Sequence, residues 1–187
     1  METTHFIIEG ISHITDPGGY DHMLFLLALS CQFEWPRWKK SLWLITAFTL
    51  GHSITLGLSA AGFVAVSSNI IEILIAVSIL LTALAGLTAQ YIKRDFGILL
   101  PYVITTFFGL IHGAGFSSYF KMIAGDSEFI WQLFPFNLGV EIGQIIILII
   151  ITTLRFVAKE IHLEKRFNQL SLITASLLSI FMLIDRI

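Results

Sequence analysis

Six ionisable side chains of this chain lie in or beside long apolar stretches of sequence, where such groups are costly. Three are histidines and three are carboxylates: Asp21, His22, His52, Glu72, His112 and Glu141. A charged group at the centre of a membrane helix costs about 3 kcal/mol on insertion scales, so ionisable residues there mark functional sites by default. Imidazole nitrogens and carboxylate oxygens together bind divalent transition metals. The simplest hypothesis is therefore one shared metal site.

The types of donor atom restrict which metal ions could bind, but they do not identify a single ion. Cys31 is the single cysteine, which excludes both an internal disulfide and a thiolate cage. Imidazoles and carboxylates without thiolates suit Zn²⁺, Ni²⁺, Co²⁺, Fe²⁺ or Mn²⁺. We expect a divalent transition metal ion (Ni, Co or Zn), and its charge would be balanced by the carboxylates in the low dielectric of a membrane.

The composition places these residues in an integral membrane protein. The chain has 187 residues, of which 56% are hydrophobic and 13% are charged, whereas soluble domains carry about 25% charged residues. The net charge of −2 and the lack of a basic stretch give no indication of a nucleic-acid partner. The first ten residues are acidic and lack a basic region, so no cleaved signal peptide is predicted. We expect a single domain whose partners are the lipid bilayer and the metal ion; the composition indicates no particular oligomeric state.

The apolar stretches predict an all-α, polytopic transmembrane helix bundle with six spans, because a helix needs about 20 apolar residues to cross a bilayer. The first stretch is shorter than a full span and is predicted to continue into the preceding segment through a break at residues 16–19, where proline and glycines disfavour helix. Residues 1–19 form an N-terminal extracytoplasmic segment, with a possible interfacial helix around Thr4–Ile14, and residues 20–184 form the bundle. The six stretches are Tyr20–Phe33, Lys40–Ala60, Ser68–Gln90, Gly97–Tyr119, Ile130–Val157 and Phe167–Ile184.

Basic residues predict the orientation of these spans, because Lys and Arg concentrate in cytoplasmic loops. Alternate loops hold nine basic residues against two in the remaining loops and termini. The nine are Arg37, Lys39, Lys40, Lys93, Arg94, Arg155, Lys159, Lys165 and Arg166. This split predicts that both termini are extracytoplasmic.

Under that topology all six ionisable groups fall in the outer half of the membrane, although they belong to five different spans. Asn137, Glu141 and Gln144 follow an i, i+4, i+7 spacing, so they share one helical face. Asn137 and Gln144 are therefore expected to orient Glu141 as supporting partners. The inner half is predicted to be aliphatic, as in Ile73–Ile79 and Ile145–Ile151.

Each candidate also has a structural interpretation. A membrane histidine can simply bond a neighbouring carbonyl group, and Asp21 can be an ordinary acid in the first turn of a helix. His13, just before the predicted break, is either a ligand or a surface residue, whereas His5 and His162 are expected to be solvated. Glycines beside His52, His112 and Glu141 are typical of close helix packing, which would also let the ligands converge.

Six blocks of sequence containing these residues resemble the HupE/UreJ family, in the family's order. They are Gly10–His13, Gly19–Leu27, Phe48–Leu56, Glu72–Ile79, Phe108–Phe116 and Phe136–Gln144. The resemblance implies a small multi-pass protein of the bacterial cytoplasmic (inner) membrane, associated with nickel or cobalt uptake for hydrogenase and urease maturation. The family's first motif is a His, five residues and then Asp-His; here seven residues separate His13 from Asp21.

Two classes of function stay open on these observations. The first is a nickel- or cobalt-type permease or binding protein, with a metal site of His22, His52, His112, Asp21, Glu141 and Glu72, joined by His13. The second is an intramembrane zinc-type hydrolase acting on a lipid or peptide, in which three histidines and water form an open site and a carboxylate is the general base. Metal sensing, storage or a scaffold role would use the same donors. The resemblance favours transport over catalysis.

Overall fold

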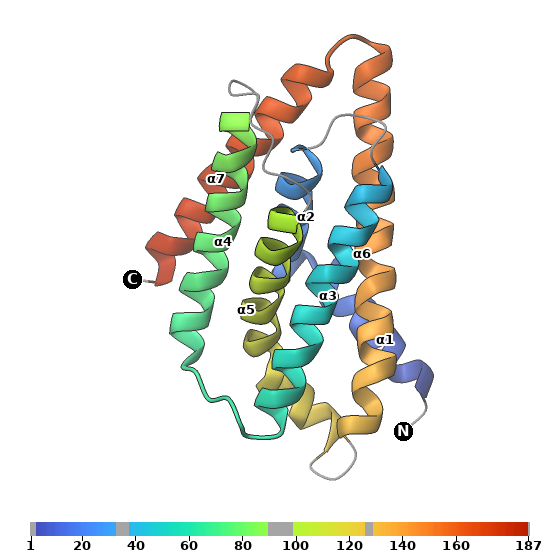
Figure 1. The fold of residues 1–187 in the computed structure, drawn as a ribbon, viewed down its shortest axis with the longest axis vertical. Coiled ribbons are helices and arrows are strands. Elements are labelled where there is room, and N and C mark those ends of the chain that lie inside the picture. Colours follow the sequence, from blue (N-terminus) through green and yellow to red (C-terminus); the bar gives the residue numbers. More distant parts are fainter. Residues whose placement is uncertain (1–2, 33–37, 90–98, 126–128, 187) are drawn as a thin grey trace.

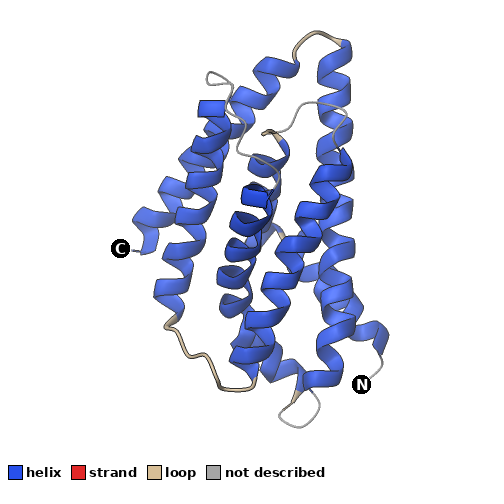
Figure 2. Ribbon diagram, viewed as in Figure 1, coloured by secondary structure: helices blue, strands red, loops and turns tan. Residues whose placement is uncertain are grey.

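The computed structural model describes residues 3–32, 38–89, 99–125 and 129–186, and within these ranges the regular structure is entirely helical. Figures 1 and 2 show a bundle of elongated helices, so the predicted all-α class is confirmed. The elements are α1 (Thr3–Thr15), η1 (Pro17–Gly19), α2 (Asp21–Ser30), α3 (Trp38–Ala60), α4 (Ser68–Ala89), α5 (Leu99–Ala124), α6 (Phe129–Glu160) and α7 (Glu164–Arg186).

Four of the helices in the described ranges, α3, α4, α6 and α7, are long and apolar enough to cross a membrane. Large apolar side chains face outward on the bundle, including Leu50, Ile149 and Phe181, as expected of helices that meet lipid. The chain is thus built as a multi-pass membrane protein. α2 has 10 residues and is about 15 Å long, so it cannot cross a bilayer core of about 30 Å by itself. The count of six crossings stays a prediction.

The N-terminal helix ends at the predicted break, and it packs into the bundle. α1 ends at Thr15, and the short 3-10 helix η1 begins with Pro17. The side chain of Asp16 caps it, because Asp16 Oδ1 accepts a hydrogen bond of 2.9 Å from the backbone N–H of Gly18. Phe6 and Ile14 are fully buried, and α1 packs along α6. α1 is therefore an integral part of the bundle, and α2 follows it after a sharp turn.

Glycines bring the backbones of two helix pairs into direct contact. α3 packs most extensively against α5, and α1 against α6. A Cβ atom at Gly109 or Gly113 of α5 would overlap the carbonyl oxygen of Phe48 or His52 on α3. Only a hydrogen in place of a side chain allows this approach, as in small-xxx-small helix pairs. The contact at Gly113 sets His112 beside the helical turn that carries His52.

Many of the described basic residues gather at one end of the bundle. Figure 1 shows that α3 begins, α6 ends and α7 begins at the same end of the molecule. The described basic residues of these segments are Lys39, Lys40, Arg155, Lys159, Lys165 and Arg166. We call this the basic end. Arg37, Lys93 and Arg94 lie outside the described residues. The side of the membrane on which each end lies stays a prediction.

Candidate metal centre

Four imidazoles from four different helices meet inside the bundle. His13 comes from α1, His22 from α2, His52 from α3 and His112 from α5. The centroid of the His22 ring lies 4.7 Å from that of His13, 5.0 Å from that of His112 and 6.5 Å from that of His52. The rings of His13 and His52 are 5.8 Å apart. His22 is thus the centre of the cluster, with His13 and His52 on one side of it and His112 on the other.

The donor atoms form two overlapping groups that meet at His22. One group contains His13, His22 and His52, and the other contains Asp21, His22 and His112. Within each group, one donor atom per residue lies within 4.8 Å of the others. Ligands bound at about 2.0–2.2 Å to one tetrahedral ion are separated by roughly 3.5 Å. Small rotations of the side chains would therefore bring either group onto an ion.

Each of the four imidazoles has one buried nitrogen without a hydrogen-bond partner. These atoms are Nε2 of His13, His22 and His52, and Nδ1 of His112. A buried polar atom without a partner costs about 1–3 kcal/mol, so native proteins rarely leave several side by side. A metal ion bound by these nitrogens would remove that cost, and the residues present therefore fit such an ion.

The second ring nitrogen of three imidazoles is held by an oxygen. Nδ1 of His22 lies 3.1 Å from Asp21 Oδ1, and Nδ1 of His52 lies 3.3 Å from Asn137 Oδ1. Nε2 of His112 lies 3.4 Å from the hydroxyl oxygen of Ser78. Metal-binding histidines typically donate their other N–H to such an oxygen, which fixes the ring and its tautomer.

The hydrogen bonds of these partners show which ring nitrogen keeps a lone pair. The amide nitrogen of Asn137 donates to the carbonyl oxygen of Leu133 at 2.8 Å, so its Oδ1 accepts from His52 Nδ1–H. The hydroxyl of Ser78 donates to the carbonyl oxygen of Ile75 at 2.7 Å, so its oxygen accepts from His112 Nε2–H. In both rings the remaining nitrogen carries the lone pair, and it is the nitrogen that lacks a partner.

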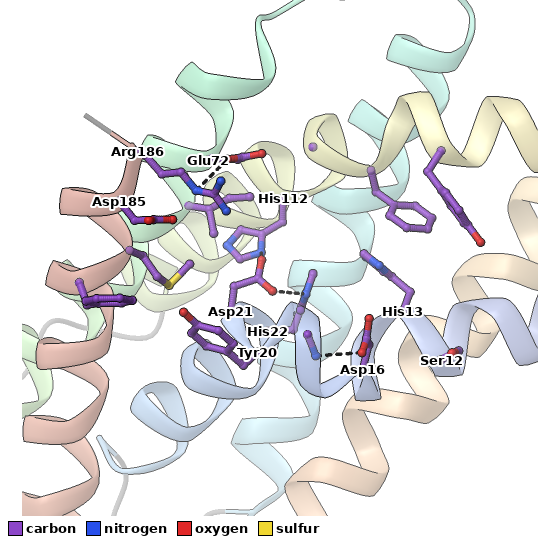
Figure 3. A pocket seen from close by; sticks show the side chains of 18 of the residues that line it. Ser12, His13, Asp16, Tyr20, Asp21, His22, Glu72, His112, Asp185 and Arg186 are labelled. Atoms are coloured by element: carbon purple, nitrogen blue, oxygen red, sulfur yellow. Dashed lines mark hydrogen bonds and ion pairs between the residues drawn. The ribbon is translucent and has the colours of Figure 1, made fainter.

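A cavity of about 560 Å³ opens beside the cluster, and five of the six Asp, Glu, Lys and Arg residues that line it are acidic. Figure 3 shows Asp21 between His22 and His112, with His13 across from them. The other lining carboxylates belong to Glu9, Asp16, Glu72 and Asp185, and Arg186 is the basic residue of the lining. A cleft with this excess of negative charge raises the local concentration of cations. The acidic residues of the cavity therefore favour cations over anions beside the imidazoles.

Two of the expected carboxylate ligands lie outside both groups of donors. Glu72 is at the edge of the cavity, where its carboxylate pairs with Arg186 at 2.9 Å and its side chain is 38% exposed. Glu141 accepts a hydrogen bond of 2.7 Å from the hydroxyl of Thr46. Asn137 and Gln144 were expected to orient Glu141, but Asn137 contacts His52 and Gln144 bonds Thr49 of α3.

The structure adds Ser78 to the site and clarifies the place of three other histidines. Ser78 is a small polar residue within an otherwise aliphatic run, and that contrast is the sequence signal that could have indicated it. His13 joins the cluster, because the η1 turn folds the end of α1 against the start of α2. His5 and His162 are exposed, as expected.

Comparison with known proteins gives one family. The family model described as HupE / UreJ protein matches residues 1–185. No curated protein and no solved structure matches the chain. The match covers almost the entire length, including every histidine of the cluster and the helices that carry them. The chain belongs to the HupE/UreJ family.

Proposed function

We propose that the protein is a permease for a divalent transition metal, of the nickel or cobalt type, in the bacterial cytoplasmic membrane. The ion is the cargo, and it binds to His13, His22, His52, His112 and Asp21. The observation that carries this proposal is the set of four unpartnered ring nitrogens that converge from four helices. Support comes from the acidic cavity beside them and from the association of the family with nickel and cobalt uptake.

The competing hypothesis is an intramembrane zinc-type hydrolase. Such an enzyme would need a carboxylate free to act as general base beside the three histidines. Asp21 is the carboxylate nearest to the cluster, and one of its oxygens already contacts Nδ1 of His22 at 3.1 Å. The role of Asp21 is better explained as holding a ligand than as accepting a proton from water, which favours the permease.

Ion flux into proteoliposomes tests the proposal. We expect saturable uptake of Ni²⁺ or Co²⁺ into vesicles that contain the purified protein, measured with a metal-sensitive dye inside them. Vesicles without protein and uptake of Mg²⁺ are the controls, because imidazole-rich sites bind Mg²⁺ poorly. Metal bound by the protein without any uptake would contradict a permease and support binding or catalysis.

The proposed orientation places both termini and the cavity on the extracytoplasmic side, with the basic end in the cytoplasm. Its basis is the split of nine basic residues against two. A reporter enzyme that is active only outside the cytoplasm should work when it is fused after Ile187. A fusion at this position that is active only in the cytoplasm would reverse the orientation.

A further inference from the structure

A second group of polar side chains lies between α3 and α6, on the basic-end side of the histidine cluster. On α3, Thr49 and Thr46 follow His52 at intervals of one helical turn toward the basic end. The hydroxyl of Thr49 donates to Gln144 Oε1 at 2.8 Å, and the hydroxyl of Thr46 donates to Glu141 Oε1 at 2.7 Å. None of these four residues belongs to the two groups of metal donors.

Two hydrogen bonds connect the same two helices at residues three apart on each helix, which places the four side chains next to one another. α3 and α6 run in opposite directions (Figure 1). In an antiparallel pair the later residue of one helix lies opposite the earlier residue of the other, yet here Thr49 reaches Gln144 and Thr46 reaches Glu141. We call Thr46, Thr49, Glu141 and Gln144 the oxygen cluster.

The oxygen cluster is surrounded by apolar side chains. Thr49 and Gln144 are buried, and Thr46 and Glu141 are half-buried. Ile45 on α3 and Ile147 and Leu148 on α6 belong to the hydrophobic core beside them, and Leu50 faces outward. An ionised carboxylate in such a setting is costly unless a positive charge compensates it. A cation bound by these oxygens would supply that positive charge beside Glu141.

The donors of this cluster differ in kind from those of the histidine cluster. They are one carboxylate, two hydroxyls and one amide carbonyl, so every donor is an oxygen. Oxygen ligands suit Mg²⁺, Ca²⁺ and Mn²⁺, whereas imidazole suits Ni²⁺ and Zn²⁺. An oxygen site should thus hold Ni²⁺ more weakly than the four imidazoles do. Passage through a membrane protein needs sites that bind an ion and also release it.

We infer that the oxygen cluster is a second, weaker cation site that receives the metal ion from the histidine cluster on its way to the basic end. The inference rests on the proposed function, and it assigns to Glu141 a role separate from the first binding event. Thr49 links the two sites, since it is one turn from His52 on the same helix and bonds Gln144 of the oxygen cluster.

Glu141→Gln tests the inference, because it keeps the shape of the side chain and removes its charge. Ni²⁺ binding is titrated calorimetrically, and Ni²⁺ uptake is measured in proteoliposomes. We expect a tight and a weak class of sites in the natural protein. The variant should lose the weak class of sites and keep the affinity of the tight class within twofold. Its uptake rate should fall at least tenfold. Glu160→Gln, at an exposed position of the same helix, is the matched control and should change neither quantity.

Thr46→Val supplies a second measurement should the first variant fold poorly. Valine keeps the branched shape and removes the hydroxyl that bonds Glu141. Uptake should fall about threefold to tenfold, with the tight class retained. Thr153→Val is the control, because the Thr153 hydroxyl is exposed and bonds only the carbonyl oxygen of Ile149 in its own helix.

Three results would overturn the inference. Unchanged uptake and two intact classes of sites in both variants would remove the role of the oxygen cluster and leave the proposed permease standing. Loss of the tight class in Glu141→Gln would place Glu141 in the histidine site. A single class of sites in the natural protein would leave no second site to assign. Absence of both binding and uptake in the natural protein would instead refute the proposed function, and this inference with it.

Discussion

His52→Ala and His112→Ala should each remove tight Ni²⁺ binding by the purified protein while leaving the amount of folded protein in the membrane unchanged. Each variant removes one converging ring nitrogen, and in both cases that nitrogen has no hydrogen bond to lose. Loss of a supporting group outside the ligand set typically weakens metal affinity 10–100-fold. Loss of a ligand should exceed that, so we expect a weakening of more than about 100-fold.

Calorimetric titration with Ni²⁺ measures this loss, and size-exclusion chromatography in detergent checks the fold. His162→Ala is the matched control. His162 lies in the turn after α6 at the basic end, is exposed and has a φ of 59°. The His162→Ala variant should leave the Ni²⁺ affinity unchanged. Unchanged metal binding in both deep variants would refute the assignment of the site.

Gly113→Ala should destabilise the protein and weaken Ni²⁺ binding at the same time. The added Cβ would overlap the carbonyl oxygen of His52, so α5 has to move away from α3. Overpacking of this kind costs roughly 1–3 kcal/mol. Because His112 is adjacent to Gly113 and His52 is the residue that is displaced, the movement separates two ligands. We expect Ni²⁺ affinity to fall at least tenfold, which is a larger decrease than the loss of packing alone would cause.

Gly115→Ala is the comparison that isolates the cause, because it places the same substitution two residues further along the same helix. Its Cβ would lie 3.2 Å from a methyl group of Ile71, a side chain that can yield. Thermal unfolding in detergent and Ni²⁺ titration should show a near-neutral variant. Equal losses in the two variants would indicate a general intolerance of α5 to alanine rather than a specific contact with His52.

The helices were predictable because apolar length and glycine–proline breaks act locally. The bounds of α3, α4 and α6 differ from the predicted spans by a few residues, and η1 lies at the predicted break. The first span was predicted too long. Its apolar residues continue past Ser30, but α2 ends there. Hydrophobicity alone does not determine where a helix ends.

The donors that meet in the cluster, the four histidines and Asp21, were all named from the sequence, whereas the surroundings of Glu72 and Glu141 were not. Burial at a shared depth follows from topology, which places His52 and His112 on either side of His22. The orientation of each carboxylate depends on its hydrogen-bond or ion-pair partner, and these partner residues are distant in sequence. Glu72 is drawn to Arg186, and Glu141 to Thr46 on another helix. Sequence spacing carries no signal for such pairs.

The glycine contacts have a mechanical consequence. They hold the backbone of α3 against α5 and that of α1 against α6, so we expect each pair to move as one rigid body. His52 and His112 belong to the first body, and His13 belongs to the second. The oxygen cluster joins the same two bodies, through hydrogen bonds rather than backbone contact. Any rocking of one body against the other changes the distances between donors in both clusters, while every helix and every contact within each body stays intact.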